Sequence, residues 1–328
     1  MNISVFGCGA WGTALSMVLA DNNHKVLAWS FEEKTKNDIN NQHENIDFLS
    51  GFKLSPNINA SLDPQEVAQF SNIWIGVLPS QTIRGFFQKL NKTTKQISFV
   101  NASKGIELGT GKLLNDVYTE IFPQNYRVCN LSGPSFANEV ADKQPTLVTL
   151  SGTDANTIES IAELFKTPYF RPYKSDDVVG TEIGGALKNV IAIASGVALG
   201  CGFRINSQSA LLTRALSEIS RFGLAHGAKL ETFMGLSGMG DLILTCLGEL
   251  SRNKALGIEI GKGGNPKKVL ESKRTVAEGY YTAKAVYNII EHKGLDLPML
   301  KTIYEVLYED KKPLDALKYL MLRPTRWE

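Results

Sequence analysis

The stretch Gly7-Cys8-Gly9-Ala10-Trp11-Gly12 decides the fold of the first half of this chain. It follows the apolar run Ile3–Phe6, which predicts a short strand, and it precedes Thr13–Ala20, which predicts a helix. Glycine-x-glycine-x-x-glycine in that setting is typical of dinucleotide sites. The first glycine permits a tight turn, the second lets the backbone approach a pyrophosphate, and the third lets helix and strand pack closely. The free N–H groups at the helix start favour phosphates, so the turn predicts a dinucleotide-binding site.

Outward from this turn, β-rich runs alternate with helical patterns up to about residue 175. The expected strands are Ile3–Phe6, Lys25–Trp29, Asn72–Val77, Ile97–Asn101, Arg127–Leu131, Thr146–Leu150 and Tyr169–Arg171. The expected helices are Phe31–Asn41, Asp63–Gln69, Gln81–Leu90, Leu113–Phe122 and Asp154–Phe165, with caps at Asp63 and Asp154. This alternation predicts an α/β domain, a Rossmann-type mainly parallel sheet with helices on both faces.

After Asp177 the strand signal fades and helical patterns dominate. The expected helices are Val178–Leu199, Ser207–His226, Glu231–Phe233, Leu242–Cys246, Ser251–Ile260, Thr282–His292, Met299–Glu309 and Pro313–Leu322. We therefore expect two domains, a dinucleotide-binding domain over residues 1–177 and an all-helical substrate and catalytic domain over residues 178–328.

Composition narrows the function classes. The 328 residues are 43% hydrophobic and 21% charged, which is typical of soluble globular proteins. A net charge of +2 gives no reason to expect nucleic acid or an anionic membrane as partner. The long apolar stretch Ile183–Cys201 contains Lys188, Asn189 and four glycines, so it suits a buried helix better than an integral membrane segment.

Cysteines and histidines argue against disulfide and metal chemistry. The four cysteines lie far apart without a Cys-x-x-Cys pair, which favours free thiols in a reducing, cytoplasmic compartment. The four histidines lack the spacing of metal ligands, so no metal site is expected. A start at Met1 that runs directly into a strand gives no sign of a signal peptide.

The residues after the second expected strand bear on the choice between NAD and NADP. An acidic residue about 20 positions beyond the glycines binds the ribose hydroxyls of NAD, whereas an arginine there accommodates the extra phosphate of NADP. This chain has Glu32 and no adjacent arginine, although Lys34 could meet a phosphate. Glu32 and Glu33 could equally belong to a helix N-terminus, so the choice stays open.

Two loops at expected strand ends carry polar groups. In Asn101–Glu107, Lys104 lies between Ser103 and Gly105 and can reach an anionic ligand; it could also be a solvated loop lysine. In Ser132–Glu139, small residues and a proline predict a tight loop followed by a short helix capped by Ser135, which could be structural only.

The helical half contains a lysine in an unusual setting. Lys188 lies in a helix whose apolar residues cover most of its circumference, and a lysine there is costly unless it is paired or functional. Desolvation lowers the pKa of a lysine toward the range in which it can exchange a proton near neutral pH. A lysine that reaches solvent is the alternative. Downstream, Asp241 follows a glycine-rich segment as an N-cap or a catalytic carboxylate, and Arg252-Asn253 suits a phosphate or a solvated surface.

In this order, the motifs resemble those of bacterial NAD(P)-dependent glycerol-3-phosphate dehydrogenases, from Gly7 to about Ala283. The motifs are GCGAWGTAL, NASKGIE, SGPSFANEV, TEIGGALKNVIAIASG, GLSGMGDLILTC, SRN and VAEGYYTA. The resemblance implies interconversion of dihydroxyacetone phosphate and sn-glycerol 3-phosphate by hydride transfer with NAD or NADP, which supplies glycerol 3-phosphate for phospholipid synthesis. A homodimer is expected.

The same resemblance implies roles for individual residues. Lys188 matches the proton acceptor, with Asp241 and Lys104 as further catalytic groups. The implied substrate contacts are Lys104, Gly133, Ser135, Lys188, Asp241, Thr245, Ser251, Arg252 and Asn253. The implied cofactor contacts are Gly7, Gly9, Ala10, Trp11, Gly12, Phe31, Lys104, Ala137, Arg252, Val276 and Glu278.

Two positions depart from the family pattern. Ala10 stands where many members have serine, which removes one hydroxyl contact to the pyrophosphate. Phe31 stands where many members have a basic residue, which weakens an inherited preference for NADP.

Two other readings make different predictions. A related β-hydroxyacid dehydrogenase would act on carboxylate substrates in place of a phosphate ester. A non-catalytic nicotinamide-binding module would bind the cofactor without consuming it, but it has no evident use for a buried Lys188.

Overall fold

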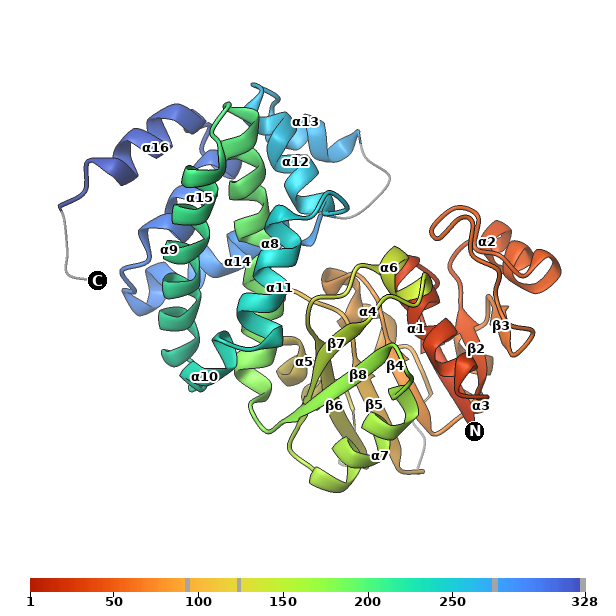
Figure 1. Cartoon of the computed structure of the whole chain (residues 1–328). Coiled ribbons are helices and arrows are strands. Elements are labelled where there is room, and N and C mark those ends of the chain that lie inside the picture. The colour runs from red at the N-terminus through yellow and green to blue at the C-terminus, as the bar shows by residue number, and fades with distance from the viewer. Residues whose placement is uncertain (92–94, 123–124, 273–276, 325–328) are drawn as a thin grey trace. The chain divides into compact units, whose positions relative to one another are not determined.

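One sheet organises the first half of the chain (Figure 1). The computed structural model describes residues 1–91, 95–122, 125–272 and 277–324. In these residues the strand order is β3-β2-β1-β4-β5-β6-β7-β8. The strands are β1 (Asn2–Phe6), β2 (Lys25–Trp29), β3 (Ile58–Ser61), β4 (Ile73–Gly76), β5 (Ile97–Asn101), β6 (Tyr126–Ser132), β7 (Thr146–Gly152) and β8 (Phe170–Ser175). Neighbouring strands run parallel except for β6 and β7, so the expected mainly parallel sheet is confirmed.

Strand β3 was not predicted. It is a four-residue edge strand whose sequence, INAS, has only one strongly apolar residue, Ile58. Its pairing with β2, from Val26 opposite Ile58 to Trp29 opposite Ser61, therefore comes from tertiary contacts and not from a local apolar run.

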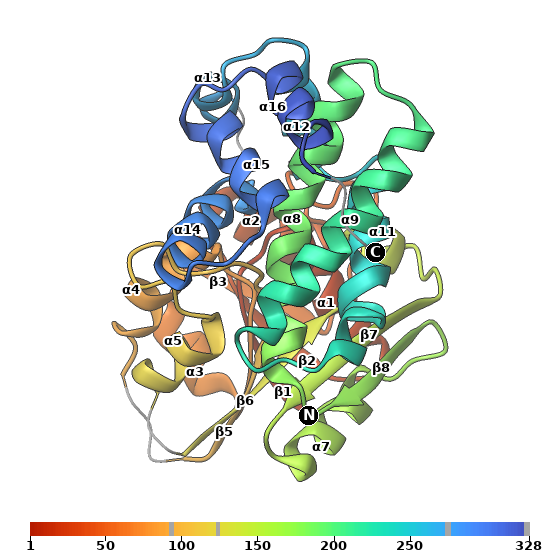
Figure 2. The same cartoon turned by 90° about the vertical axis from the view of Figure 1, so that its left-hand side faces the viewer.

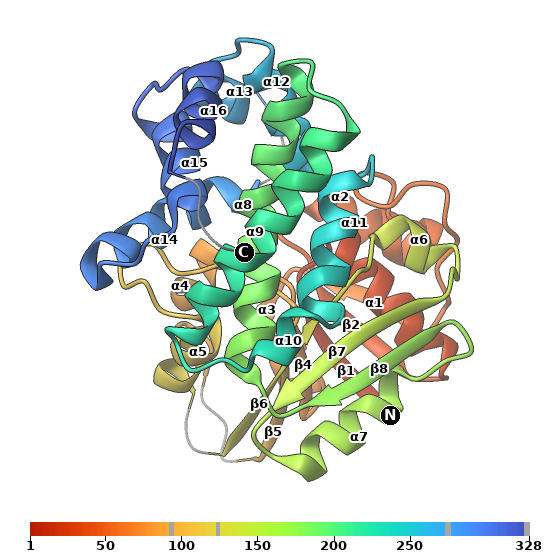
Figure 3. The ribbon, with the colours of Figure 1, turned by 60° about the vertical axis from the view of Figure 1, so that its left-hand side comes forward.

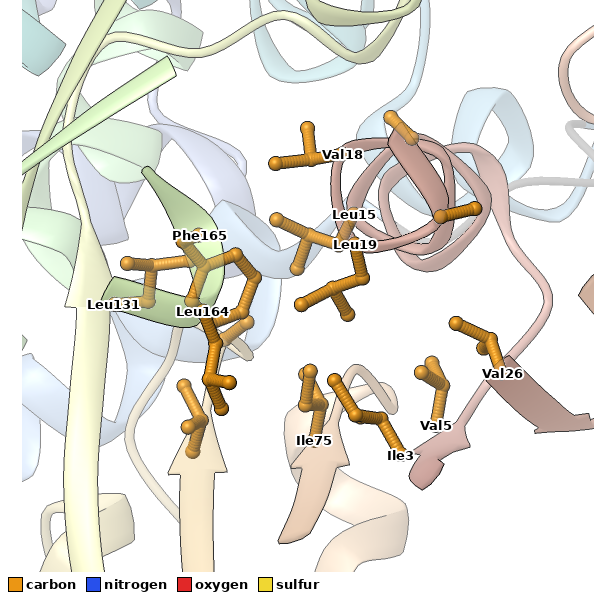
Figure 4. Packing of buried hydrophobic residues seen from close by; sticks show 14 of the residues in the cluster. Ile3, Val5, Leu15, Val18, Leu19, Val26, Ile75, Leu131, Leu164 and Phe165 are labelled. Carbon is orange, nitrogen blue, oxygen red and sulfur yellow. The ribbon is translucent and has the colours of Figure 1, made fainter. Parts of the chain in front are cut away.

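Helices cover both faces of the sheet. One core cluster joins the sheet to α1 (Ala10–Asp21), α6 (Ala137–Ala141) and α7 (Ala155–Phe165). Figure 4 shows Leu15 and Leu19 of α1 directed toward Ile3, Val5 and Ile75 of the sheet. A second cluster joins the other face to α3 (Pro64–Phe70), α4 (Ile83–Phe87) and α5 (Leu114–Ile121), which lie together in Figure 2. The central parallel strands β1, β4 and β5 are accordingly buried along most of their length.

Helix starts follow the capping residues read from the sequence. Asp63 accepts a hydrogen bond from the backbone N–H of Gln65 and has Pro64 at the first helical position. Asp154 accepts from the backbone N–H of Thr157 at 2.7 Å. The expected helix Phe31–Asn41 is shorter, α2 (Glu33–Asn37), and continues as a π-helical turn, η1 (Asp38–Gln42). A 3₁₀ turn, η2 (Ser80–Thr82), precedes α4.

The rest of the described chain is helical. Its elements are α8 (Val178–Gly200), α9 (Ile205–Leu224), α10 (Leu230–Phe233), the π-helical turn η3 (Leu236–Gly240), α11 (Asp241–Leu247), α12 (Arg252–Gly261), α13 (Pro266–Glu271), α14 (Glu278–Lys293), α15 (Pro298–Tyr308) and α16 (Pro313–Met321). Helices α8 and α9 run side by side (Figures 1 and 3), joined by the Ser195 hydroxyl, which donates to Gln208 Oε1 at 2.5 Å.

Two compact units result. The first comprises Met1–Lys104 and Leu114–Thr181, and the second comprises Gly105–Leu113 and Glu182–Glu328. The change of unit thus falls inside α8, a few residues after the domain boundary expected at residue 177, and the short segment Gly105–Leu113 belongs with the helices. Helix α8 is apolar and long enough to span a membrane by composition alone, as is the segment Leu230–Leu247. Most of α8 is buried inside the protein, as expected for a core helix.

Candidate active site

The glycines of the first turn each meet different surroundings. Gly7 has φ +123°, and a Cβ there would lie 2.4 Å from the carbonyl oxygen of Val77. A Cβ on Gly12 would lie 1.9 Å from the carbonyl oxygen of Gly7. A Cβ on Gly9 would meet nothing within 4 Å. Gly7 and Gly12 are therefore required by the fold itself. Gly9 instead has open space where its Cβ would lie, which lets a pyrophosphate approach the protein backbone.

The start of α1 presents hydrogen-bond donors that suit an anionic ligand. Helix α1 begins after Gly9 without a side-chain cap, so its first N–H groups have no side-chain acceptor at that position. The indole Nε1 of Trp11 is buried and has no hydrogen-bond partner in the described part of the chain. An uncapped helix N-terminus beside an orphaned donor and an open glycine fits the pyrophosphate of a dinucleotide. The residues present therefore fit this cofactor.

A polar network at the strand ends positions Lys104. Asn130 Oδ1 accepts from the Asn101 amide at 2.9 Å, and Asn101 Oδ1 accepts from the backbone N–H of Ser103 at 3.1 Å. The Ser103 hydroxyl in turn accepts from the backbone N–H of Leu78 at 3.0 Å. This network ties the ends of β4, β5 and β6 together and fixes the backbone that carries Lys104.

Lys104 contacts the second polar loop, Ser132–Glu139. Its Nζ lies 3.5 Å from the carbonyl oxygen of Gly133, and that oxygen also accepts from the Ser135 hydroxyl at 3.0 Å. The expectation that Ser135 caps the following helix is wrong. Helix α6 begins at Ala137 with Phe136 as its N-cap residue, and the Ser135 hydroxyl is directed back into the loop. The first unit thus joins Lys104, Gly133 and Ser135 in one cluster.

The second unit contains a buried ion pair. Lys188 Nζ on α8 donates to Asp241 Oδ1, and the same oxygen accepts from the Thr245 hydroxyl at 3.4 Å. Lys188 is 8% exposed and Asp241 is fully buried. Asp241 is the first residue of α11, with Gly240 as N-cap residue, so its carboxylate pairs with the lysine and is not an N-cap. Buried ion pairs add little net stability, which favours a functional role for this one.

A glycine one helical turn before the lysine makes this pairing possible. A Cβ on Gly184 would lie 2.4 Å from the carbonyl oxygen of Ser237, in the turn η3 that leads into Asp241. Residues 184 and 188 share a face of α8. The missing side chain therefore lets the backbone of η3 approach α8 beside Lys188.

A second network links three helices of this unit. Asn253 donates to Asn189 Oδ1 at 3.0 Å, and its own Oδ1 accepts from the backbone N–H of Gly279 at 3.0 Å. These two bonds fix the orientation of the Asn253 amide and leave its second N–H available. Asn189 follows the buried lysine, and Asn253 lies in the first turn of α12, where a helix N-terminus favours an anion.

Three further predicted residues, Ser251, Arg252 and Glu278, are sequence neighbours of Asn253 and Gly279. Ser251 is the N-cap of α12 and accepts from the backbone N–H of Lys254 at 3.2 Å, while the neighbouring Arg252 is exposed. Glu278 is the first residue of α14, directly before Gly279. Val276, an expected cofactor contact, lies outside the described residues.

Two buried thiols lie close to the groups described above. Burial raises the pKa of Cys8, in the glycine turn, to about 12, and it does the same for Cys246, close to the ion pair. Both stay protonated near neutral pH and are poor nucleophiles. No group of three or more His, Cys, Asp and Glu side chains suited to a metal occurs in residues 1–91, 95–122, 125–272 and 277–324.

Sequence reasoning missed the residues that position others. Asn189 carried a signal, because an amide in a buried apolar helix needs a partner. Asn45, whose amide donates to the Cys8 carbonyl oxygen at 2.8 Å and to the Thr13 hydroxyl at 2.7 Å, carried none. It lies in an irregular loop without a motif.

Comparisons with known proteins find the same family along the chain. Models of the N-terminus and the C-terminus of NAD-dependent glycerol-3-phosphate dehydrogenase match residues 2–158 and 177–318. The chain is 42% identical to a glycerol-3-phosphate dehydrogenase [NAD(P)+] from Citrifermentans bemidjiense, over 99% of this chain and 98% of that protein. The crystal structure of glycerol-3-phosphate dehydrogenase from Coxiella burnetii matches with a TM-score of 0.92 and 30% identity, over 98% and 99% of the two chains.

Proposed function

The chain belongs to the NAD-dependent glycerol-3-phosphate dehydrogenase family, and from that premise we propose how its residues perform the reaction. It is an NAD(P)-dependent oxidoreductase that interconverts dihydroxyacetone phosphate and sn-glycerol 3-phosphate. The observation that carries the proposal is the buried pair of Lys188 and Asp241. The glycerol 3-phosphate formed is a precursor for phospholipid synthesis.

Lys188 is the proton-transferring residue of the proposal. When bound, the reduced nicotinamide supplies a hydride to the ketone carbon, and negative charge then grows on the carbonyl oxygen. The Lys188 ammonium stabilises this charge and donates a proton to the oxygen. In the opposite direction the neutral amine accepts the hydroxyl proton. Asp241 keeps the buried ammonium compensated and, with Thr245, holds its position.

The other residues hold the two ends of the reactants. Arg252 and the remaining N–H of Asn253, at the start of α12, bind the substrate phosphate, aided by Ser251 and by the Lys104, Gly133 and Ser135 cluster. Fixing the phosphate orients the carbon that reacts. The turn Gly7, Gly9, Ala10, Trp11 and Gly12 holds the cofactor phosphates, and Phe31, Ala137, Val276 and Glu278 are further cofactor contacts.

Lys188→Ala tests the assignment. We expect the variant to lose at least about 100-fold in kcat for dihydroxyacetone phosphate reduction, the usual contribution of a general acid. Its dissociation constant for the dinucleotide, measured by calorimetry, should stay within about twofold of the wild-type value. Lys262→Ala, which removes an exposed lysine 3.5 Å from Glu259, is the control and should be neutral.

Removal of the lysine takes a charge partner away from the buried Asp241 carboxylate, which can unfold the helical unit. The double variant Lys188→Met/Asp241→Asn removes both charges and keeps the proposal testable. A folded variant of either kind that retains most of its activity would exclude Lys188 from proton transfer.

We further propose a homodimer in the cytoplasm. Large apolar side chains, Leu230, Met234, Ile243 and Leu247, are between 44% and 50% exposed on α10 and α11 and their connection, which supports a protein partner. The free cysteines support a reducing compartment. Sedimentation equilibrium at micromolar concentration should give twice the chain mass, and a monomer there would contradict the dimer. Cell fractionation should recover the protein with soluble cytoplasmic markers; recovery with membranes or outside the cell would contradict this.

A further inference from the structure

We propose that this protein selects NADH over NADPH, because the segment after β2 offers a carboxylate to a ribose hydroxyl and repels a 2′-phosphate. The inference rests on the proposed function and deepens it, since it concerns the adenosine end of the same dinucleotide. Its basis is the set of contacts made by residues 29–47 in the first unit.

The end of β2 presents an aromatic surface where a phosphate would need cations. Phe31 is 85% exposed, and its ring centroid lies 6.3 Å from that of Trp29. Trp29 packs in turn against Phe86, with centroids 4.5 Å apart. An exposed aromatic ring can stack on a flat, uncharged group but gives a phosphate no hydrogen bond. This position therefore contributes no attraction for the extra charge of NADPH.

The lysine nearest to Phe31 in the sequence, Lys34, already forms ion pairs with two carboxylates. Lys34 Nζ lies 2.7 Å from Asp47 Oδ1 and 3.1 Å from Asp38 Oδ2. Hydrogen bonds to these two carboxylates raise the pKa of Lys34 above its ordinary value. To form an ion pair with Lys34, a 2′-phosphate would have to compete with the carboxylates of Asp38 and Asp47. It would also lie close to these two negative charges, which repel it. The alternative that Lys34 binds the phosphate of NADP is therefore disfavoured.

The acidic loop is fastened to the dinucleotide turn. The buried amide of Asn45 donates to the carbonyl oxygen of Cys8, within the glycine turn, and to the hydroxyl of Thr13, directly after it. Asp47 follows two residues later and reaches Lys34 from there. The carboxylates thus have a fixed place relative to the turn that holds the cofactor, and they do not move away with a free loop.

Charge favours the same conclusion. Residues 30–47 contain five carboxylates, Glu32, Glu33, Asp38, Glu44 and Asp47, against two lysines, a net charge of −3. Glu32 stands at the start of α2, where it can accept a hydrogen bond from the 2′-hydroxyl of NADH. A phosphate in place of that hydroxyl brings nearly two further negative charges to a net acidic surface.

Titration of the cofactor-free protein tests the inference without turnover. We expect calorimetry to give a dissociation constant at least about 10-fold lower for NADH than for NADPH at low ionic strength. The ratio should shrink in 0.5 M KCl, because salt screens repulsion between exposed charges. Equal affinities at low salt, or a preference for NADPH, would overturn the inference. If neither dinucleotide binds, the proposed function itself fails.

Two variants locate the selectivity. Phe31→Arg supplies a fork-shaped cation and should lower the NADPH dissociation constant by about 10-fold or more while changing that of NADH little. Asp47→Asn removes the shorter of the two ion pairs of Lys34. It should also lower the NADPH dissociation constant, by about 3-fold. Glu163→Gln is the control, because it removes a carboxylate from an exposed pair outside this segment, between Glu163 on α7 and Lys166. An NADPH affinity that neither Phe31→Arg nor Asp47→Asn changes would show that selectivity does not reside in this segment.

Discussion

Single residues of the first turn divide into those that the fold needs and those that only a ligand needs. Gly7 and Gly12 have backbone oxygens of their own unit where a Cβ would lie, whereas Gly9 has open space there. The same contrast holds in the helical unit. There Gly184 faces the carbonyl oxygen of Ser237, and Lys188 on the same face meets Asp241. Glycine spacing alone does not separate these roles.

Substitution of Gly9 and of Gly12 by alanine should therefore give opposite results. Gly12→Ala forces a methyl group against the Gly7 carbonyl oxygen, so we expect a loss of roughly 1–3 kcal/mol in unfolding free energy, as is usual for overpacking. Gly9→Ala should keep the stability of the wild type but lose at least about 10-fold in dinucleotide affinity, because the methyl group occupies the approach to the pyrophosphate. Chemical denaturation and calorimetry measure the two effects. A stable Gly9→Ala protein with unchanged affinity would contradict this division.

Pairs of helices depend on glycine in a similar way. Gly196 and Gly200 of α8 lie against Gly257 and Gly261 of α12, with the backbones so close that a Cβ on Gly257 would lie 2.0 Å from the carbonyl oxygen of Ile193. This close packing holds α12, which carries Arg252 and Asn253 in its first turn, against the C-terminal part of α8, the helix that carries Lys188 near its middle. The packing of the two helices, and not any one side chain, sets the distance between Lys188 and the proposed phosphate-binding residues Arg252 and Asn253.

Gly257→Ala should displace α12 and separate these functions. We expect the KM for dihydroxyacetone phosphate to rise by about 10-fold or more, while the dissociation constant of the dinucleotide changes little, because the glycine turn lies in the other unit. Steady-state kinetics and calorimetry together provide the measurement. Gly85→Ala on α4 is the control, since a Cβ there meets nothing within 4 Å and alanine favours a helix. An unchanged KM in Gly257→Ala would show that α12 does not depend on this contact.

At the scale of the whole molecule, the cofactor turn and the buried lysine lie on different compact units. Each unit has its own weakly basic side chain with a pKa lowered mainly by burial. These are His24, which also faces the N-terminal ammonium, and His226, whose ring packs on Phe222 and faces Lys293. Both favour the neutral imidazole in the folded state. Glu218 accepts hydrogen bonds from the backbone N–H groups of Met299 and Leu300. Burial raises the pKa of this carboxyl group, whereas it lowers the pKa of the two histidines.

Acidification should therefore destabilise both units in the histidine range. A histidine with a lowered pKa takes up a proton more readily when unfolded, so its stabilisation is present above about pH 6.5 and is lost as the pH falls through the folded value. Glu218 opposes this, because its contribution is present at low pH and is lost as the pH rises above about 4.5. We expect the unfolding temperature to fall between pH 7 and pH 5.5, and to fall less in the His226→Gln variant. A transition temperature that is constant over this range in the wild type would contradict the expectation.

The resemblance of its motifs to a family indicated the reaction, and the sequence by itself determined the class of fold. Short-range patterns did this: the spacing of three glycines between a strand and a helix, the period of the apolar residues, and the cap residues Asp63 and Asp154. Such signals act over a few residues and depend little on the rest of the chain. The sequence also indicated that Lys188 was exceptional, because an apolar helix leaves a lysine few alternatives.

The tertiary structure decided what each polar residue meets. Lys188 and Asp241 are 53 residues apart, Asn45 and Thr13 are 32 apart, and Lys34 and Asp47 are 13 apart, and no local pattern predicts these pairs. The same holds for Ser135, which its sequence predicts as a helix cap and which the loop instead directs to Gly133. Hydrogen bonds and ion pairs act only at contact distance, so long-range partners follow from how the backbone packs and not from the residue types alone.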